Sequence, residues 1–400
     1  MSGNHVLVIG GNFGGLTAAL ELKHELGADV DVAVLSAADR FLFSPSLMWL
    51  PFGKRQAGDI TFPLEPVFGL HDIGFAHAEV TAIDPAAQTV CAGAASYGYD
   101  YLVIATGCRN RFDAVPGLGP GGYAQTITTL DDAERAGRAW QKFLDDPGPV
   151  VIGAAQGASC FGAAYEFLFT MSRQLRRAKV RVPLTFITAE PFVGDFGIGG
   201  LPGGERLLRV FLKKEGVMVL TGVAFEEVGA DRVRLTDGSS VPFRYAMVVP
   251  PFAGQELARA TPGLSDEQGY IPVLDTYQST AYPRIYAAGI AAQLPVPWQT
   301  AVPVGMPRTG FPAETMAKVA AGNIAAAIRG EPPAGHQDFG QLAAVCTMDA
   351  GSNGVMVLAD HLLPPRKAAV MIPGPQVHAM KVAFEKYYLW KSRHGYVRLP

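Results

Sequence analysis

The feature that most restricts the fold is a glycine-rich turn near the start of the chain, within HVLVIGGNFGGLTAALELKHEL. The apolar run predicts a buried strand, the glycines predict a tight turn, and the apolar spacing after them predicts a helix. A second apolar run, DVDVAVLSA, completes a β-α-β unit. Glycines at such a turn let the backbone approach a pyrophosphate, whose charge lies at the helix N-terminus.

This turn departs from the usual dinucleotide pattern at two positions. Asn12 lies between Gly10 and Gly15 where a glycine is common, but asparagine tolerates left-handed backbone, so the turn can form. Ser36 stands where an acidic residue would hold a ribose, and serine hydrogen-bonds a ribose without clamping it. The site therefore favours a dinucleotide, although the evidence for a nicotinamide is weaker.

Two later strand ends fit the same unit. YDYLVIATG, residues 99–107, ends in Thr106 and Gly107, as in flavoproteins with two dinucleotide units. YPRIYAAGI, residues 282–290, ends in Gly289 and Ile290, where aspartate is usual at the last position. Three such strand ends in this order predict FAD.

A second nucleotide-binding core begins at VVIGAAQGASC, residues 150–160. Its loop lacks the Gly-x-Gly-x-x-Gly spacing, and Glu190 is the one acidic residue that could bind a ribose after the next strand. Cys160 lies at the predicted helix start, where the helix dipole is expected to lower the pKa of a thiol. Glu166, six residues on, could transfer protons. Taken alone, these two residues are better explained as a buried structural cysteine and a surface glutamate.

Composition excludes several classes of protein. The net charge of −3 gives no reason to expect nucleic acid as a partner. Four cysteines form no disulfide framework, and no Cys or His spacing predicts a metal site. The N-terminus has no signal-peptide pattern, and no apolar run approaches the roughly 20 residues of a membrane span. We therefore expect synthesis in the cytoplasm and only peripheral membrane contact, on a membrane face that the sequence leaves open.

Cys346 changes the interpretation of Cys160. Two cysteines so far apart in the chain can meet only if the fold brings them together, and Cys346 is expected to end a short buried strand. The motifs GASCFGAAYEF, LVIATG, YAAGIAA, PRTGF and AVCTMDAG, followed by KVAFEKYY, resemble sulfide:quinone oxidoreductases. They also resemble the related flavoprotein subunit of flavocytochrome c sulfide dehydrogenase. The resemblance runs from residue 5 to about residue 393.

The resemblance implies a redox pair formed by Cys160 and Cys346 on one face of a flavin. Sulfide would attack the oxidised pair and leave a persulfide, and the other thiolate, assigned to Cys346, would pass two electrons to the flavin. Repeated turnover would release zero-valent sulfur or polysulfide. Glu166 matches the family's acid beside the first cysteine and is assigned proton transfer, whereas Cys91 and Cys108 have no assigned role.

The resemblance also implies FAD as the cofactor. Some relatives attach the flavin covalently through a cysteine, but this chain has Thr128 and Thr129 in that stretch, so we expect non-covalent FAD. Lys381 matches a lysine near the pyrimidine end of the flavin, where positive charge stabilises the reduced form. The expected FAD-binding residues are Gly10, Gly11, Asn12, Phe13, Gly14, Gly15, Ser36, Pro45, Val80, Thr106, Gly107, Gly289, Ile290, Thr309, Gly310 and Lys381.

The electron acceptor is expected to be a membrane quinone, bound between residues 40–55 and 378–400. Its expected wall residues are Phe43, Pro45, Phe384 and Tyr388. The tail combines aromatic residues with one acid, Glu385, and a set of basic residues, namely Lys381, Lys386, Lys391, Arg393 and Arg398. Such a tail is typical either of an interfacial membrane anchor or of a helix packed on the protein body. A homo-oligomer would strengthen a weak membrane attachment.

The expected fold is α/β, with two Rossmann-like dinucleotide-binding domains of the disulfide-reductase type and a C-terminal capping segment. Residues 1–110 and 265–330 would bind FAD, residues 111–264 would carry the first redox cysteine, and residues 331–400 the second, together with the quinone-facing and membrane-facing surface. Three alternatives stay open: a sulfide dehydrogenase that donates to cytochrome c, an NADH:quinone reductase, and a flavin-binding scaffold without activity.

Overall fold

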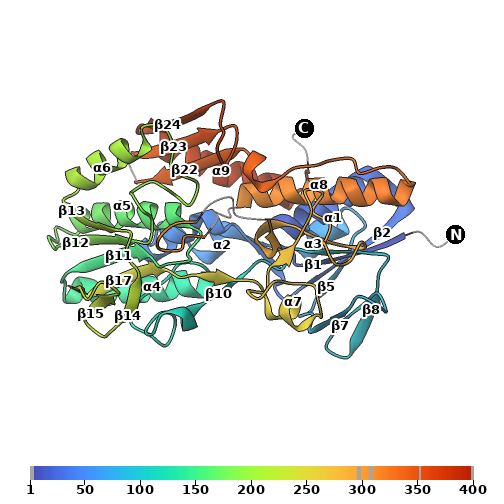
Figure 1. Ribbon diagram of the computed structural model, residues 1–400, viewed down its shortest axis with the longest axis horizontal. Coiled ribbons are helices and arrows are strands. Elements are labelled where there is room, and N and C mark those ends of the chain that lie inside the picture. Colours follow the sequence, from blue (N-terminus) through green and yellow to red (C-terminus); the bar gives the residue numbers. More distant parts are fainter. Residues whose placement is uncertain (1–3, 295–298, 306–309, 351–352, 398–400) are drawn as a thin grey trace.

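The computed structural model describes residues 4–294, 299–305, 310–350 and 353–397. Two α/β units lie side by side along its long axis, and a small antiparallel sheet with a helix covers one side of them (Figure 1). The predicted α/β fold with two Rossmann-like units is confirmed.

The first unit is built on a parallel sheet of five strands in the order β20-β9-β1-β2-β5. The last four residues of the central strand, Val6 to Ile9, are all apolar and buried, as expected when helices cover both faces. The elements of this unit are β1 (Asn4–Ile9), α1 (Phe13–Leu26), β2 (Val30–Ser36), β5 (Gly74–His77), β9 (Tyr101–Ile104), β20 (Ile285–Ala287) and α8 (Gly310–Arg329). Helix α8 packs along α1 although some 300 residues separate their starts.

The second unit has a parallel sheet of four strands in the order β13-β12-β11-β17. A three-stranded antiparallel sheet packs against it and encloses a second, smaller apolar core. The elements are α4 (Leu130–Asp145), β11 (Val150–Ala154), α5 (Phe161–Arg177), β12 (Leu184–Thr188), α6 (Gly204–Lys214), β13 (Val217–Thr221), β14 (Phe225–Val228), β15 (Arg232–Leu235), β16 (Ser240–Pro242) and β17 (Tyr245–Val249).

The C-terminal segment forms an antiparallel sheet of β22 (Ala344–Asp349), β23 (Gly354–Ala359) and β24 (Ala369–Pro373), followed by α9 (Gln376–Arg393). Strand β22 packs against both α5 and α9, so this segment joins the second unit (Figure 1). The site described below lies where these three elements meet the 3-10 helix η2 (Ser44–Phe52).

Shorter elements complete the chain. They are β3 (Arg40–Leu42), α2 (Ala57–Ile60), β4 (Thr61–Pro63), α3 (Glu65–Gly69), β6 (Ala82–Asp84), β7 (Thr89–Ala92), β8 (Ala95–Gly98), β10 (Arg109–Asn110), β18 (Phe252–Ala253), α7 (Glu256–Ala260), β19 (Ile271–Pro272) and β21 (Ala292–Gln293), with the 3-10 turns η1 (Gly27–Asp29), η3 (Phe112–Ala114), η4 (Gly289–Ala291) and η5 (Phe339–Gln341). Strands β10 and β18 pair between the two units.

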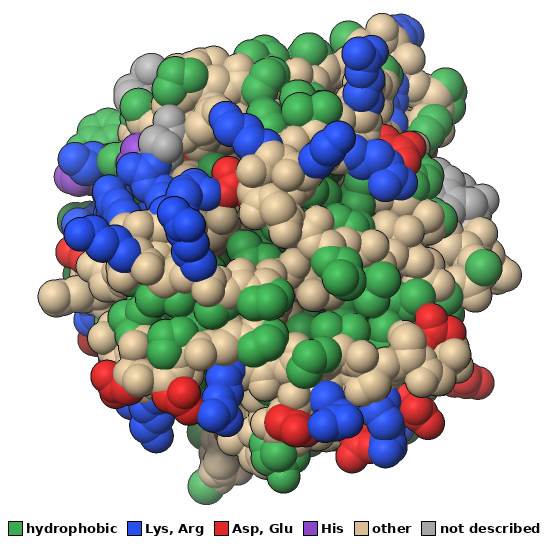
Figure 2. Space-filling view, turned by 90° about the vertical axis from the view of Figure 1, so that its left-hand side faces the viewer, with side chains coloured by type: hydrophobic (Ala, Val, Ile, Leu, Met, Phe, Trp, Pro, Cys, Tyr) green, Lys and Arg blue, Asp and Glu red, His purple; other side chains and the backbone are tan. Residues whose placement is uncertain are grey.

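The end of the molecule formed by the second unit has a mixed surface. Figure 2 shows Lys and Arg side chains gathered in its upper half and a band of hydrophobic side chains below them. Two large apolar side chains of this unit, Val210 and Met218, are more than half exposed. Among the described residues, no helix combines the length and the hydropathy needed to cross a membrane.

Candidate active site

The fold brings Cys160 and Cys346 to one site. Cys160 is the N-cap residue of α5, and Cys346 lies in β22, which packs against α5. The two thiols are close enough for their charges to interact. Cys160 and Cys346 are free thiols that retain partial exposure. The pair therefore lies at the junction of the second unit and the C-terminal segment.

The expectation of a lowered thiol pKa at Cys160 is wrong. Burial raises the pKa of Cys160 and outweighs the backbone N–H of Ala163, which acts in the opposite direction. Burial likewise raises the pKa of Cys346 to about 12, assisted by Glu166 and opposed by Lys381. Each residue retains some accessible surface, but protein atoms crowd each thiol and remove its hydration, which disfavours the thiolate.

The expected position of Cys346 at the end of a buried strand also needs correction. Strand β22 continues for three residues to Asp349. The neighbouring Val345 is exposed, so the strand is not buried along its length. It forms one edge of the C-terminal sheet and presents Cys346 next to β23, opposite Val357.

Glu166 is buried and not a surface residue. It projects from α5, is 3% exposed, and accepts a hydrogen bond from the Lys381 ammonium of α9. Burial raises the pKa of Glu166 to about 7, while Lys381 and the backbone N–H of Asp349 lower it. A carboxyl with a pKa near neutrality can both accept and release a proton at physiological pH.

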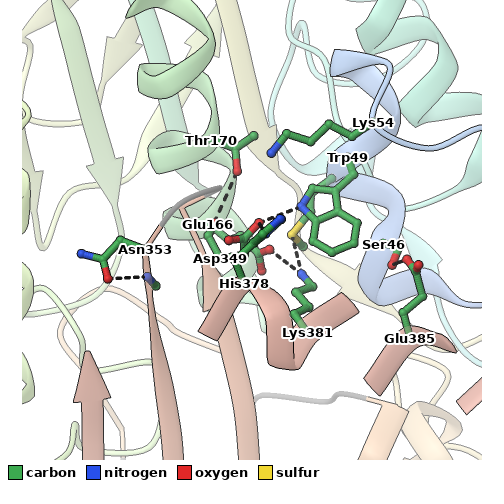
Figure 3. A network of polar contacts seen from close by, with 12 residues as sticks. Ser46, Trp49, Lys54, Glu166, Thr170, Asp349, Asn353, His378, Lys381 and Glu385 are labelled. Atoms are coloured by element: carbon green, nitrogen blue, oxygen red, sulfur yellow. Dashed lines mark hydrogen bonds and ion pairs between the residues drawn. The ribbon is translucent and has the colours of Figure 1, made fainter. Parts of the chain in front are cut away.

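Further polar residues surround this pair, and the sequence reasoning missed them. Asp349 is fully buried and accepts a hydrogen bond from the Trp49 indole N–H, 3.2 Å from its Oδ2 atom. His378 Nδ1 lies 3.0 Å from the same oxygen. Figure 3 shows these side chains converging from η2, β22 and α9 beside Glu166 and Lys381. The one signal in the sequence was that Asp349 follows Cys346 by three positions.

The glycine turn of the first unit fits a bound dinucleotide. Gly10 has φ +104°, and a Cβ atom on Gly15 would lie 1.7 Å from the carbonyl oxygen of Gly10, so neither position accepts a side chain. Asn12 is the N-cap of α1, yet its buried Oδ1 atom has no hydrogen-bond partner among the described residues. An unsatisfied polar atom at a helix start is expected where a ligand completes the site.

The other expected FAD residues lie around the same sheet edge. Gly107 follows β9 and has φ +72°. A Cβ atom added at Gly107 would lie 3.8 Å from the Ile290 side chain. Gly289 follows β20 with φ +68°. The remaining expected residues lie at strand ends, helix starts and the turns between them: Gly11, Phe13, Gly14, Ser36, Pro45, Val80, Thr106 and Gly310. Thr309 lies outside the described residues.

The loop of the second unit is closed by the chain itself. The Gly157 N–H donates to the Pro303 carbonyl at 2.7 Å, and the Ala158 carbonyl accepts from Gly305 N–H at 2.7 Å. Glu190, considered above for a ribose, is fully buried and accepts hydrogen bonds from Tyr165, Thr188 and Phe196. Its oxygens are already engaged within the protein, so the proposed ribose role is wrong.

The expected quinone residues form one aromatic group. Tyr388 of α9 lies 5.3 Å from Phe43 and 5.8 Å from Phe384, measured between ring centroids. Phe13, at the start of α1, lies 5.2 Å from Tyr388 and so joins this group to the glycine turn. Pro45 is in η2, two residues after Phe43. Phe384 is exposed, whereas Phe43 and Tyr388 are buried.

The basic tail is only partly a surface feature. Lys381 and Lys391 are buried in α9, where Lys391 pairs with Glu314 at 2.8 Å. Counting both as membrane-facing charges is therefore wrong, because each has an internal carboxylate partner. Lys386 and Arg393 are exposed on α9, and Arg398 lies outside the described residues. Within the described part of the chain, no group of His, Cys, Asp or Glu side chains could hold a metal ion.

The chain is similar to known proteins over most of its length. Residues 4–305 match the pyridine nucleotide-disulphide oxidoreductase family. The sulfide-quinone reductase of Aquifex aeolicus (strain VF5) is 35% identical and covers 98% of this chain and 91% of its own length. The type II NADH:quinone oxidoreductase of Mycobacterium tuberculosis is 27% identical over 84% of the chain and 75% of its own length. The X-ray structure of the Aquifex aeolicus sulfide:quinone oxidoreductase superposes with a TM-score of 0.93, at 34% identity, over 98% of this chain and 92% of that one.

Proposed function

This chain belongs to the sulfide-quinone reductases within the pyridine nucleotide-disulphide oxidoreductase family, and on that premise we propose a mechanism for its reaction. The protein oxidises sulfide and uses a quinone as electron acceptor. Cys160 and Cys346 carry the sulfur chemistry, Glu166 moves the proton, and FAD links the thiols to the quinone.

One observation carries the proposal: α5, β22 and α9 place Cys160, Cys346 and the Glu166–Lys381 pair at one site. Removing charges from water costs free energy, so a buried ion pair such as Glu166–Lys381 is expected where the charges have a task in the reaction. Thiols next to a carboxyl that can exchange protons near neutral pH are suited to thiol–disulfide exchange with sulfide.

The sulfur chemistry starts from the oxidised cysteine pair. The sulfur of HS⁻ bonds to one cysteine sulfur and breaks the bond between the two, which yields a persulfide and a thiolate. When bound, FAD supplies a two-electron carrier between this thiolate and the quinone. Joining the two cysteine sulfurs through the added sulfur releases one proton and two electrons, and the quinone finally accepts the electrons. Each further HS⁻ then adds one sulfur in the same way, and the chain is released as zero-valent sulfur or polysulfide.

Glu166 and Lys381 control protons and charge at the thiols. The high thiol pKa at Cys346 means that the thiolate needs a nearby base and a nearby positive charge. Glu166 as carboxylate accepts the proton that a sulfur atom loses at the thiol site. Lys381 balances the negative charge that remains on sulfur. Lys381 also lies 3.2 Å from Met48 Sδ and 4.9 Å from the Trp49 ring centroid, which fix its ammonium group.

The glycine turn after β1 would hold the FAD pyrophosphate, and the strand ends at Gly107 and Gly289 would lie beside the rest of the cofactor. No cysteine lies at Thr128 or Thr129, which supports non-covalent binding. The aromatic group of Phe43, Phe384 and Tyr388 would bind the quinone ring. The exposed side chains Met380, Phe384 and Trp390, with Lys386 and Arg393, would meet the membrane surface that contains the quinone.

One experiment distinguishes the proposed reaction from two alternatives, which are NADH as the electron donor and cytochrome c as the electron acceptor. An NADH reaction requires the second glycine loop, but contacts from Pro303 and Gly305 occupy its backbone groups. Anaerobic mixing of the FAD-loaded protein with sulfide should bleach the flavin, and NADH should not. Decyl-ubiquinone should then restore the oxidised spectrum, whereas cytochrome c should not. Bleaching by NADH alone, or reoxidation by cytochrome c alone, would reject the proposal.

A further inference from the structure

Glu166 is enclosed by protein, but a chain of polar side chains leads from it to the surface. The carboxylate accepts the backbone N–H of Asp349 as well as the Lys381 ammonium. The Asp349 side chain is 0% exposed, while the side chain of its neighbour His378 is 38% exposed. Figure 3 shows Glu166, Asp349 and His378 grouped together, with Trp49 and Lys381 beside them.

His378 lines an open hollow of about 760 Å³ together with Trp49. The other charged or titratable side chains that line this hollow are Lys54, Arg55, Asp59, Arg177, Glu385, Lys386, Arg393 and His394. The imidazole stands edge-on to the Trp49 ring at 6.0 Å between centroids. Trp49 in turn donates to Asp349, so one indole fixes both partners. Solvent protons therefore reach His378 directly, and Asp349 lies between His378 and Glu166.

We propose that Asp349 and His378 are positioning residues that set when the buried Glu166 carboxyl releases and regains its proton. The inference rests on the proton-transfer role proposed above for Glu166. Asp349 and His378 take no part in the sulfur chemistry, and their effect on the proton of Glu166 is electrostatic.

The action is through charge and not through a continuous proton wire. His378 Nδ1 is 3.0 Å from Asp349 Oδ2, but the two groups are not aligned as a hydrogen bond. Glu166 is bonded to the backbone N–H of Asp349, which cannot pass a proton on. A carboxylate at Asp349 makes ionisation of Glu166 harder. A positive charge on His378, whose Nδ1 atom lies 3.0 Å from that carboxylate, would offset this effect.

Other charges face the same pair and must be counted. Lys54, which follows η2, interacts with Asp349 and Glu166, and its own pKa is lowered by burial. Arg173 of α5 also interacts with Asp349. His378 differs from these cations in its position, because its Nδ1 atom lies 3.0 Å from Asp349 Oδ2.

Glu190 provides a contrast within the same unit. Its pKa is also raised by burial to about 7, but its oxygens are held by Tyr165, Thr188 and the Phe196 N–H. None of these groups titrates near neutrality, and no imidazole contact with Glu190 is described. Burial, assisted by Asp195, therefore explains the raised pKa of Glu190. Glu166 differs because it interacts with Asp349, which lies beside the partly exposed His378.

The test follows the proton on Glu166 directly, by infrared difference titration of the FAD-loaded full-length protein. The carbonyl band of protonated Glu166 is identified by its loss in Glu166→Gln. In the unmodified protein it should disappear with a midpoint at about 7. We expect the midpoint to rise by about half a pH unit or more in His378→Gln and to fall in Asp349→Asn. The matched control His361→Gln also removes an imidazole 3.1 Å from an aspartate on the C-terminal segment, and it should leave the midpoint unchanged.

Adding His378→Gln to Asp349→Asn should produce a smaller shift than His378→Gln does alone, because Asp349 is the carboxylate that lies beside His378 and raises the pKa of Glu166. An unchanged midpoint in His378→Gln overturns the proposal, and so does an undiminished His378 effect in the Asp349→Asn background. If Asp349→Asn does not fold, the comparison of the Glu166 midpoint in His378→Gln and in His361→Gln still tests the proposal. The titration needs no turnover, so the positioning role and the sulfide reaction can fail independently. Where both hold, the pH profile of flavin reduction by sulfide shifts in the same direction as the infrared midpoint.

Discussion

Lys381 of α9 donates a hydrogen bond to Glu166 of α5 across 215 positions of the chain, and both side chains are almost completely buried. The pair lies beside Cys346, whose pKa responds to both charges. A buried ion pair at a thiol site has a clear use if the carboxyl moves a proton and the ammonium balances the charge left behind.

Replacing Glu166 with glutamine should slow flavin reduction by sulfide about 10²- to 10⁴-fold, the usual contribution of a general base. The pKa of Glu166 is about 7, above its ordinary value, and the carboxylate is the active form. The ratio of the unmodified to the variant rate should therefore grow as pH rises through about 7, and ionisation of sulfide cancels in this ratio. Glu190→Gln removes another buried carboxyl with a pKa of about 7 and should leave the ratio flat. A pH-independent ratio for Glu166→Gln would rule out the base role.

Replacing Lys381 with glutamine should move the activity profile to higher pH by about one unit or more. Lys381 lowers the pKa of Glu166, so its removal leaves only factors that raise or weakly lower that pKa. Breaking a buried pair also costs about 3–5 kcal/mol of stability. Lys391→Gln is the matched control, since Lys391 lies on the same helix as Lys381 and pairs with Glu314 of α8. This variant should cost stability without moving the profile. Stopped-flow rates across pH and denaturant unfolding separate the two effects.

Replacing Gly15 with alanine should abolish FAD binding, because the new Cβ would lie 1.7 Å from the Gly10 carbonyl oxygen and force the turn open. Gly322 of α8 has open space around its Cα atom, so Gly322→Ala should bind FAD normally and stabilise its helix by up to about 1 kcal/mol. The ratio of flavin to protein absorbance after purification measures both. Full flavin content in Gly15→Ala would show that the cofactor binds elsewhere.

Replacing Trp390 and Met380 with serine should weaken binding to anionic lipid vesicles, by about 1 kcal/mol or roughly fivefold for each side chain. Both are exposed on α9 and neither belongs to the predicted quinone wall. Val210→Ser with Met218→Ser removes apolar side chains of the second unit that are even more exposed, and it should leave vesicle sedimentation unchanged. Equal losses in both pairs would indicate nonspecific adhesion in place of a membrane-facing helix.

Local patterns in the sequence were sufficient to predict the glycine turn of the first unit and the strand and helix on either side of it. The spacing of glycines after an apolar strand depends only on neighbouring residues, so the turn at Gly10 to Gly15 could be predicted together with the strand and helix around it. The resemblance to a known family then supplied Cys160, Cys346 and Glu166 as candidates. No periodicity in the chain could have paired them.

The rest of the site depends on contacts between distant segments. Asp349, Trp49 and His378 come from three elements, and none stands in a motif of its own. Two electrostatic expectations failed for the same reason. The helix start at Cys160 was weighed without its desolvation, and the charges of Lys381 and Lys391 were counted without their buried carboxylate partners. Burial and pairing are properties of the folded chain.

Single-turnover reduction of the bound flavin by sulfide, with each cysteine changed in turn, tests the central claim most directly. Cys160→Ser and Cys346→Ser should each reduce the rate by at least about a hundredfold, because serine can form neither a persulfide nor a sulfur bridge. Cys91→Ser, on the separate antiparallel sheet of β6 to β8, should retain the full rate. Rapid flavin reduction in either of the first two variants would contradict the assignment of these cysteines as the working pair.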